Sequence, residues 1–367
     1  MNYRRTKAMA RKELLHILRD PRSLIMALAV PMMLLLLFSY ALSLDVDRIP
    51  AIVYDQDGSP QSRELAARFT GSRYFNVVAQ ARDYKDVERA IDLGDCIVAV
   101  VFPPDFSHHL RASKPTSVQI LLDGTDSNTA SIAMAYAESI IGGYSLELVH
   151  RTPPAEARIR VWYNTDLKSR NFIIPGLVAV ILMIIAALLT SLTIAREWEN
   201  GTMEQLLSTP LRPVEIITGK LAAFFLLGVA DSIISIVSAV FVFDVPLRGN
   251  LLFLALTTCV FLAGVLTWGL FISSISNTQL MAYQIGLMTS FLPGFLLSGF
   301  IYAIENMPVV IQVVTHIVPA RYFVTILKAV FLKGAGLEAL WAEVLFLVGY
   351  ALIVAALAVK TLKKKVA

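Results

Sequence analysis

Charged side chains are scarce in this sequence. Only 16% of its 367 residues are Asp, Glu, Lys or Arg, while 56% are hydrophobic and the mean hydropathy is +0.65. An ordinary soluble domain carries about 25% charged residues. The composition therefore excludes a soluble protein of this size and predicts an integral membrane protein.

Cysteine is nearly absent, and the motifs of common enzymes are absent altogether. Cys96 and Cys259 give neither a disulfide framework nor the spacing of a metal site, so we expect two buried thiols. The sequence has no GxxxxGK[ST] phosphate loop, no nucleophile–base set and no cluster of metal ligands. It therefore predicts a chain that is not catalytic by itself, holds no metal and binds no cofactor.

Six long apolar runs are each suited to crossing a bilayer as a helix. They cover residues 23–44, 172–194, 221–243, 251–275, 280–304 and 340–359. The predicted fold is an α-helical polytopic membrane protein with six transmembrane helices. Residues 23–44 form the first of them, and the other five belong to a membrane domain over residues 172–367.

The net charge of +4 is unevenly distributed along the chain. Residues 45–171 carry a net charge of −3, and the remainder carries +7. Of the 18 Lys and Arg outside residues 45–171, 14 lie before the first run, between the second and third, or after the last. Because such residues concentrate in cytoplasmic segments, both termini are predicted to be cytosolic and residues 45–171 extracytoplasmic. A basic excess in membrane flanks also argues against a nucleic-acid partner.

Residues 45–171 alternate short strand and helix patterns, which predicts an inserted α/β or α+β domain. We expect strands at 48–54, 74–79, 96–102, 118–122 and 158–163, and helices at 61–69, 84–92, 105–112 and 126–149. Residues 55–58 and 123–126 group carboxylates near a glycine, and we interpret them as turns rather than cation sites. His108 and His109 are interpreted as a solvated pair, because adjacent side chains on a helix diverge.

A charged island, REWENGTMEQLLSTPLRPVEIITGK at residues 196–220, separates the second and third runs. Thr202 and Gln205 have the spacing of a capping box, and Gly201 precedes them. Pro210 is expected to end this short helix, and Pro213 suits the first turn of the next one.

The short helix is predicted to present an apolar knob with an acidic collar. Held at the membrane surface by the two neighbouring spans, such a knob has the form of a docking element. The knob would be Met203, Leu206 and Leu207, and the collar Glu197, Glu199 and Glu204.

The island resembles the cytosolic coupling segment of type-2 ABC exporter permeases, in the subgroup with a large extracytoplasmic domain after the first span. The resemblance implies a permease subunit of a bacterial cytoplasmic (inner) membrane that exports amphiphilic or hydrophobic, drug- or lipid-like compounds. It also implies a coupling loop at residues 195–215 and a partner ABC ATPase dimer that holds ATP and Mg. The residues that carry the resemblance are Arg196, Glu197, Glu199, Gly201, Thr202, Glu204, Leu206, Leu207, Thr209, Pro210, Gly219 and Lys220.

Residues 1–22 are predicted to form a basic amphipathic helix that lies in the interface of an anionic membrane leaflet. A plain basic flank of the first span is the alternative, and both place the N-terminus in the cytosol. The polar face would carry Arg4, Arg5, Arg11 and Lys12, and the apolar face Tyr3, Ala10, Leu14, Ile17 and Leu18.

The segment between the fifth and sixth runs contains two shorter apolar stretches, residues 307–318 and 322–332. They are too short to cross a bilayer, and Pro319 and Gly334 separate and end them. We predict two outer half-helices within residues 307–333 that dip into the membrane where protein covers their ends. They would either cover the exit of a pathway or act as an interfacial clamp.

Asp231 is a carboxylate near the middle of the third run, with Ser232 and Ser235 beside it. Because an ionised carboxylate facing lipid is costly, we expect it to face protein or water. It would either line a substrate path, meeting a cation or a proton, or hydrogen-bond across a helix contact. Trp268 and Gln284 are further candidates for lining such a path.

Six helices are few for enclosing a wide polar path. We therefore expect a second copy or a homologous permease, with substrate moving along a subunit interface that the second and fifth spans line. The outer domain would receive substrate or dock a periplasmic adaptor protein. Two other classes stay open from the residues alone: a membrane-anchored receptor or scaffold that uses the outer domain, and an ion-coupled carrier with Asp231 as its proton site.

Overall fold

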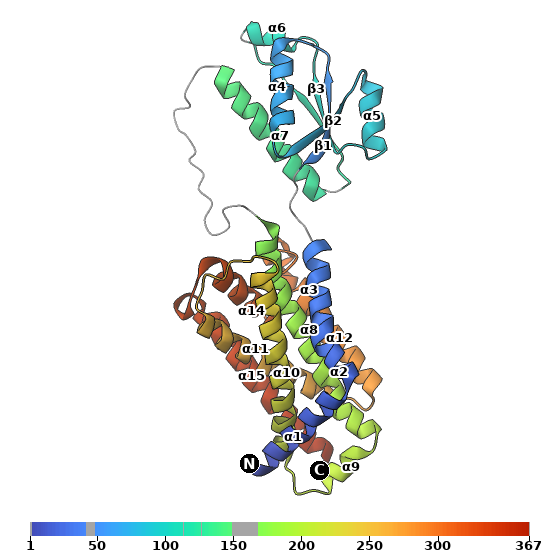
Figure 1. The fold of residues 1–367 in the computed structure, drawn as a ribbon, viewed down its shortest axis with the longest axis vertical. Coiled ribbons are helices and arrows are strands. Elements are labelled where there is room, and N and C mark those ends of the chain that lie inside the picture. The colour runs from blue at the N-terminus through green and yellow to red at the C-terminus, as the bar shows by residue number, and fades with distance from the viewer. Residues whose placement is uncertain (1, 42–47, 113, 126, 149–167, 367) are drawn as a thin grey trace. The chain divides into compact units, whose positions relative to one another are not determined.

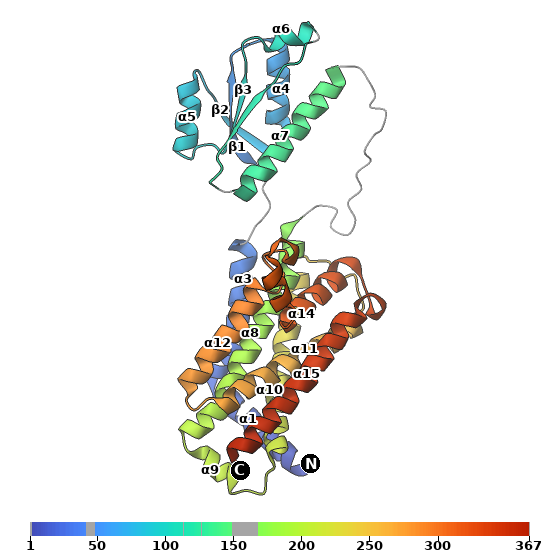
Figure 2. The ribbon, with the colours of Figure 1, turned by 180° about the vertical axis from the view of Figure 1, so that it is seen from behind.

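The computed structural model describes residues 2–41, 48–112, 114–125, 127–148 and 168–366. The chain divides into two compact units, and Figures 1 and 2 show the fold of each from opposite sides. The helical unit comprises Met1–Ser43 and Val161–Ala367, and the α/β unit comprises Leu44–Arg160.

The helical unit contains no strand in the residues that are described. Its short irregular helices are the π-helical η1 (Ile25–Ala29), the 3-10 helix η2 (Ile304–Asn306) and the π-helical η3 (Ala329–Lys333). Its α-helices are α1 (Tyr3–Arg19), α2 (Pro21–Leu24), α3 (Val30–Ala41), α8 (Ser169–Glu199), α9 (Thr202–Leu207), α10 (Pro213–Phe241), α11 (Leu251–Ile275), α12 (Gln279–Leu296), α13 (Val309–Thr315), α14 (Pro319–Lys328) and α15 (Leu337–Val366).

Helix α8 lies at the centre of the helical unit (Figure 1). Every residue from 173 to 188 is buried, and none of them is charged. A helix that is apolar all round needs neighbours on every side, and here α3, α10, α11, α12 and α14 surround it. Over residues 173–188 the surface of α8 is thus used inside one chain, and a role of the second span at a subunit interface stays a prediction.

Four helices in the described part of the chain are long and apolar enough to cross a membrane: α8, α10, α11 and α15. The bent pair of α13 with α14–η3 raises the number to five if it is taken as one span. The described residues thus show a polytopic helical protein with four or five such spans, which does not confirm the predicted count of six. The first predicted span is an almost continuous helix, α2–η1–α3, as far as Ala41, and its last residues lie outside the described part.

The fifth predicted span is shorter than expected, and it is not among these four. Helix α12 ends at Leu296 instead of continuing to residue 304. Gly299, with a φ of 75°, takes the left-handed conformation that glycine adopts without strain, and it turns the chain away from the helix axis. The sequence pattern missed this end because the residues beyond it are still apolar.

Both predicted half-helices are present, as α13 and as α14 continued by η3, and the two segments are bent by 83°. Pro319 begins α14, where its missing N–H costs nothing, and Gly334 with a φ of 70° ends η3. The ring of Phe323 stacks on Phe261 of α11 with centroids 4.0 Å apart. Helix α14 is thus anchored in the core, whereas α13 exposes much of its apolar surface.

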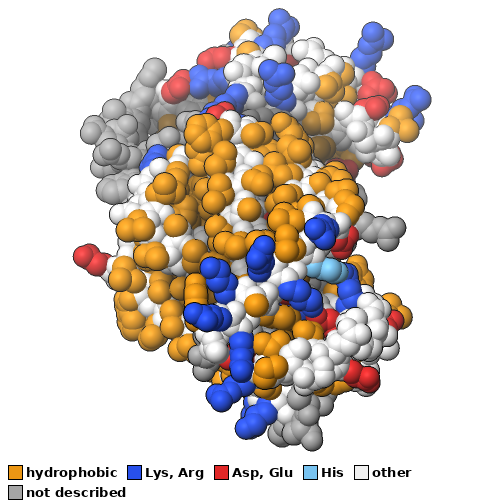
Figure 3. All heavy atoms as spheres, turned by 60° about the horizontal axis from the view of Figure 1, so that its bottom comes forward, with side chains coloured by type: hydrophobic (Ala, Val, Ile, Leu, Met, Phe, Trp, Pro, Cys, Tyr) orange, Lys and Arg blue, Asp and Glu red, His pale blue; other side chains and the backbone are white. Residues whose placement is uncertain are grey.

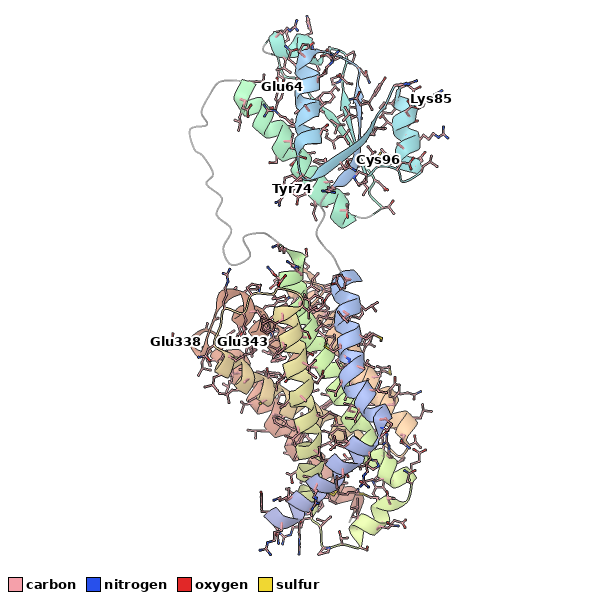
Figure 4. The ribbon with its side chains drawn as sticks, viewed as in Figure 1. Glu64, Tyr74, Lys85, Cys96, Glu338 and Glu343 are labelled. Atoms are coloured by element: carbon pink, nitrogen blue, oxygen red, sulfur yellow. The ribbon has the colours of Figure 1, made fainter. Side chains whose placement is uncertain are left out.

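Helix α15 begins with a kink. Leu340 has φ −118° and ψ 19°, at the residue where the last span was predicted to start. Glu338 and Glu343 lie on either side of this kink (Figure 4). The carboxylates are therefore confined to the first turns of α15, before its long apolar stretch.

Helices of this unit cross closely where one of them carries a small residue. A Cβ built on Gly219 of α10 would lie 2.6 Å from the Cβ of Met9 in α1, and one on Gly264 of α11 would lie 2.9 Å from the ring of Tyr350 in α15. At the crossing of α8 and α11, the Ser273 hydroxyl accepts hydrogen bonds from the backbone N–H groups of Ile194 and Ala195, each at 2.9 Å. These contacts hold the helices at fixed separations.

The α/β unit is a three-layer structure around a four-stranded sheet of order β2-β1-β3-β4. Strand β1 pairs in parallel with β2 and β3, and β3 pairs antiparallel with β4. Helix α5 covers one face, and α4, α6 and α7 cover the other (Figure 2). The elements are β1 (Ile49–Asp55), α4 (Pro60–Gly71), β2 (Phe75–Gln80), α5 (Tyr84–Asp92), β3 (Val98–Phe102), α6 (Phe106–Arg111), β4 (Gln119–Leu122) and α7 (Ser127–Leu148).

These elements confirm the predicted alternation, with bounds that differ by at most two residues. The predicted strand at 158–163 lies outside the described residues. Asp55 Oδ1 accepts from the N–H groups of Asp57 and Gly58 at 3.1 and 2.9 Å, and Asp123 Oδ1 accepts from Thr125 N at 2.9 Å, as expected of turns. Cys96 is fully buried against α5 (Figure 4).

The crossing of α1 and α10 yields the first prediction. Replacing Gly219 with Ala should destabilise the protein by about 1–3 kcal/mol, because the Cβ of Met9 cannot be moved aside by a rotamer change. Gly349→Ala is the control: it lies in α15 with nothing within 4 Å of its added Cβ, so it should be neutral or slightly stabilising. Thermal unfolding of the purified proteins measures both, and equal midpoints would rule out the close crossing.

Candidate functional site

The island forms the short helix α9, but its start differs from the predicted capping box. Gly201 precedes the helix with a φ of 71° and there is no side-chain cap. The Thr202 hydroxyl instead donates to the carbonyl oxygen of Glu197 at 3.3 Å. The turn is therefore made by the backbone freedom of Gly201, and Thr202 ties it back to the end of α8.

The apolar side of α9 points into the helical unit rather than away from it. Met203 is fully buried, and Leu206 and Leu207 are half-buried against the same cluster. The predicted knob is therefore an anchor, while Glu204 and Gln205 are exposed. The buried members of the cluster come from α1, α8, α9, α10, α11 and α15: Met9, Ile194, Met203, Ile216, Ile217, Leu270, Ala358 and Leu362.

The predicted acidic collar is divided in the same way. Glu204 is exposed, whereas Glu197 is only 7% exposed. Glu199 accepts a hydrogen bond at 2.7 Å from the backbone N–H of Gln279, at the start of α12. Arg196 donates from Nε to the Gln279 side chain at 3.3 Å. The end of α8 is thus joined to the start of α12.

Glu197 belongs to a group of four charges, three of them buried and Lys12 half-exposed, which we call the basal ionic cluster: Lys12 and Glu13 of α1, Glu197 of α8 and Lys220 of α10. Lys220 Nζ lies 3.1 Å from Glu13 Oε1 and 3.0 Å from Glu197 Oε2. Lys12 Nζ lies 3.0 Å from Glu13 Oε1 and 2.7 Å from Glu197 Oε1. Each amine meets two carboxylates, so the four charges balance.

The cluster shifts the pKa values of the two α1 side chains. Burial raises the pKa of Glu13, but the charges of Lys220 and Lys12 outweigh it, so the pKa lies below the ordinary 4.5. Burial lowers the pKa of Lys12, but the hydrogen bond to Glu197 and the nearby carboxylates raise it above the ordinary 10.5. The ionised Glu13 therefore stabilises the fold above pH 4.5 and loses its contribution as the pH falls through its folded-state pKa. The contribution of Lys12 is complete below pH 10.5 and is lost as the pH rises through the raised value.

Helix α1 is also tied to the loop that follows α9. Arg5 Nη1 donates to the carbonyl oxygen of Pro210 at 2.6 Å. The Glu215 carboxylate accepts from the backbone N–H of Asn2 at 2.7 Å and from that of Arg212 at 3.0 Å. The N-terminus, α9 and the start of α10 are thus linked by hydrogen bonds.

The predicted amphipathic face of α1 needs correction. Its buried side is Met9, Glu13 and Ile17, which follow one another at intervals of four residues and pack on α10. Tyr3 and Leu18, predicted to be on the apolar face, are 74% and 58% exposed. Arg4 and Arg11 are exposed as predicted, but Arg5 and Lys12 make the protein contacts described above. Glu13, a glutamate within a basic helix, was the sequence signal for this buried side, and the prediction did not use it.

The three candidate path residues lie on three different helices. Asp231 in α10 is 4% exposed, and its Oδ1 has no hydrogen-bond partner among the described residues. It borders a cavity of about 10 Å³ whose described lining includes neither of the other two. Trp268 of α11 donates to the Thr289 hydroxyl of α12 at 3.2 Å, and Gln284 of α12 is exposed. The structure therefore does not bring them together.

Figure 3 shows the end of the helical unit that carries α1 and α9. Lys and Arg side chains gather there, while hydrophobic side chains cover the flank above them. This distribution is typical of a membrane-embedded body with its positive end in the cytosol.

Comparison with known proteins decides the family. The sequence model described as "ABC-2 family transporter protein" matches residues 21–360. The chain belongs to the ABC-2 transporter family. Two Escherichia coli K12 proteins, each named a probable multidrug ABC transporter permease, are similar to most of it. YbhS is 36% identical over 357 residues, which are 96% of this chain and 94% of YbhS. YbhR is 33% identical over 342 residues, which are 92% of this chain and 93% of YbhR.

The similarity extends to a eukaryotic protein. ABC transporter G family member 20 of Dictyostelium discoideum is 26% identical over 207 residues, which are 56% of this chain and 28% of that protein. Family membership confirms the resemblance carried by the island. The ABC-2 protein is a multi-pass membrane permease subunit of an ABC exporter, and the ATPase is a separate subunit.

The basal ionic cluster of this ABC-2 permease yields the second prediction. Lys220→Met should cost about 3–5 kcal/mol, because it leaves two buried carboxylates with one amine. Lys220→Met combined with Glu13→Gln should recover part of the loss by restoring the charge balance. The control is Lys85→Met, at an exposed lysine of α5 (Figure 4), which should change stability by less than about 0.5 kcal/mol. Thermal unfolding in detergent is the measurement; Lys220→Met and Lys85→Met proteins of equal stability would contradict the assignment.

Proposed function

We propose that the ATPase subunits of the exporter act on this permease at α9, and that the basal ionic cluster passes their motion to the spans. The observation that carries the proposal is the two-sided environment of α9. Met203 is fully buried among residues of five other helices, whereas its neighbour Glu204 is exposed. One side of α9 is thus fixed to the permease, and the other is free for a partner.

We assign different roles to the residues that were predicted for coupling. Glu204 belongs to the free side of α9, while Thr202 ties the start of the helix to Glu197. Arg196, Glu197 and Glu199 brace the end of α8 against α1, α10 and α12. Gly201, Leu206, Leu207 and Pro210 shape and anchor the loop.

The proposed topology places both termini, α1 and α9 in the cytosol and residues 45–171 outside it, in a bacterial cytoplasmic membrane. The basic surface around α1 and α9 supports this orientation (Figure 3). With Arg4, Arg11, Tyr3 and Leu18 exposed on α1, this helix suits the headgroup region of an anionic leaflet. We infer that residues 1–22 form an interfacial helix with one side fixed to α10.

For the substrate we infer amphiphilic or hydrophobic compounds, in line with the multidrug names of the YbhS and YbhR relatives. A dimer, with a second copy or a homologous permease, would enclose the path. Asp231 supports a polar position on that path because its carboxylate is buried with an unpartnered oxygen. Trp268 of α11 and Gln284 of α12 are further candidates for lining the path. The bent pair α13–α14 is the candidate for its outer exit. We also propose that a periplasmic adaptor protein binds the α/β unit.

The free side of α9 gives the third prediction. Glu204→Arg should weaken association with the ATPase about tenfold, equivalent to about 1.4 kcal/mol, and lower transport with it. Its thermal stability should not change, because Glu204 is exposed. Glu138→Arg, a charge reversal at an exposed position of α7, is the control. Copurification and ATPase activity of the reconstituted exporter are measured. Normal ATPase association in the Glu204→Arg protein would remove α9 from the coupling site.

Topology gives the fourth prediction. In a background with Cys96→Ala and Cys259→Ala, single cysteines replace the exposed residues Lys85 in α5 and Ser208 after α9. A membrane-impermeant maleimide should label Lys85→Cys in intact spheroplasts, and Ser208→Cys only after permeabilisation. The reverse pattern would show that the proposed orientation is inverted.

A further inference from the structure

A cavity of about 750 Å³ lies beside the basal ionic cluster. Its walls come from α1, the end of α8, α9, α10 and the start of α12. Small-molecule sites in proteins commonly measure about 300–1,000 Å³ and combine apolar walls with a few polar groups. The size and the mixed lining of this cavity are therefore those of a ligand site.

Three acidic side chains line the cavity, Glu13, Glu197 and Asp20, and the first two are already neutralised. Glu13 and Glu197 each meet two amines within the basal ionic cluster. A cationic ligand would have to displace Lys12 or Lys220 from them, and the amine of Lys220 is buried. The cluster therefore offers little to a positive charge.

Hydrogen-bond donors in the lining are less fully used. Arg196 donates from Nε to Gln279, and its Nη1 forms an ion pair with Asp20 at 3.8 Å, which is longer than a hydrogen bond. Its side chain is 35% exposed, so the guanidinium fork is available to a ligand. His16 and Lys12 of α1 line the same cavity. A guanidinium with free donors recognises phosphate or carboxylate through paired hydrogen bonds.

The remaining walls are apolar. Ile17, Leu189, Leu192 and Phe224 line the cavity, and Leu189 and Phe224 also border the smaller cavity beside Asp231. An alkyl or aromatic body can therefore lie against α8 and α10 while a head group reaches Arg196. The two kinds of wall together fit an amphiphile rather than a small ion.

The coupling helix forms part of the same cavity. Thr202, Gln205 and Leu206 of α9 are lining residues. A ligand bound there would contact α1, α8 and α9 at once. Occupancy would therefore change the contacts of the helix on which the ATPase is proposed to act.

We propose that this cavity binds an amphiphile with an anionic head group of the phosphate or carboxylate class, held by Arg196, and reports its presence to α9. The proposal deepens the proposed function and rests on its topology, which places the cavity at the inner leaflet. An anionic membrane lipid and an exported anionic compound share this chemistry.

Direct binding to the purified full-length permease in an uncharged detergent tests the proposal without the ATPase. The probes are dioctanoyl-phosphatidylglycerol, the uncharged dioctanoylglycerol, dodecanoate and inorganic phosphate, and their binding is followed by native mass spectrometry. Phosphatidylglycerol or dodecanoate should bind at least about tenfold more tightly than dioctanoylglycerol, because the neutral comparison has no phosphate or carboxylate to form a charge-assisted pair. Tight binding of phosphatidylglycerol identifies membrane lipid as the source, and binding of dodecanoate alone identifies an exported single-chain compound.

Binding to variants of the lining residues tests whether the amphiphile occupies this cavity. Arg196→Gln should weaken binding of the anionic amphiphile about tenfold, and Arg196→Lys should recover part of it. Leu192→Trp, which fills the apolar half, should weaken binding by a similar factor and carries the test if Arg196→Gln fails to fold. Arg19→Gln, an exposed arginine of α1 outside the lining, should change binding by less than about twofold.

Two results would overturn the proposal: equal affinity for phosphatidylglycerol, dodecanoate and dioctanoylglycerol, or affinity that folded Arg196→Gln and Leu192→Trp proteins retain. Inorganic phosphate binding as tightly as phosphatidylglycerol would also overturn it, since the apolar walls would then contribute nothing. These failures leave the Glu204→Arg result unaffected, so they are distinguishable from failure of the coupling role of α9.

Discussion

The base of the helical unit depends on the buried ammonium group of Lys220. Its side chain is 1% exposed, and a buried ammonium is tolerated only with oppositely charged partners at bonding distance. Glu13 and Glu197 supply them from two other helices. Moving α1, α8 or α10 independently would break one of these pairs. The requirement of one side chain thus holds three helices of the permease together at its base.

Helix α9 shares this constraint through its packing. Met203 is buried in a cluster that includes Met9 of α1 and Ile216 and Ile217 of α10, and Arg5 of α1 donates to Pro210 after α9. At the close crossing at Gly219 there is no free space between α1 and α10. Closely packed interiors transmit displacement instead of absorbing it. A force on α9 is therefore expected to move the base of the bundle as a rigid body, the kind of motion by which switching transitions proceed.

Local patterns in the sequence predict a large share of this structure. The strands and helices of the α/β unit follow their periodicity and turn residues closely, as do α9, the bent pair and α11, whose bounds match the predicted span. Each of these depends on residues near one another in the chain. The prediction of family rested on the same kind of local pattern, in the island.

The environment of each side chain depended on distant residues, and there the sequence was less informative. The pattern of α9 correctly gives an apolar side, but not whether a partner or the permease itself covers it. Lys220 is bonded to a residue 207 positions away, so its burial left no periodic signal. The end of α12 is missed because apolar residues continue past the turn at Gly299. The cavity at Arg196 likewise arises only where five segments meet.

The central claim is that α1 and α9 move together as one body. Spin labels at the exposed positions Lys7 in α1 and Ser208 after α9 allow their separation to be measured by pulsed electron paramagnetic resonance in the assembled exporter. The account predicts that the distance distribution between α1 and α9 is the same without nucleotide and with trapped ATP. The distance between a label on α9 and a label on the ATPase should change between these two states. A distance between α1 and α9 that shifts with nucleotide would contradict it.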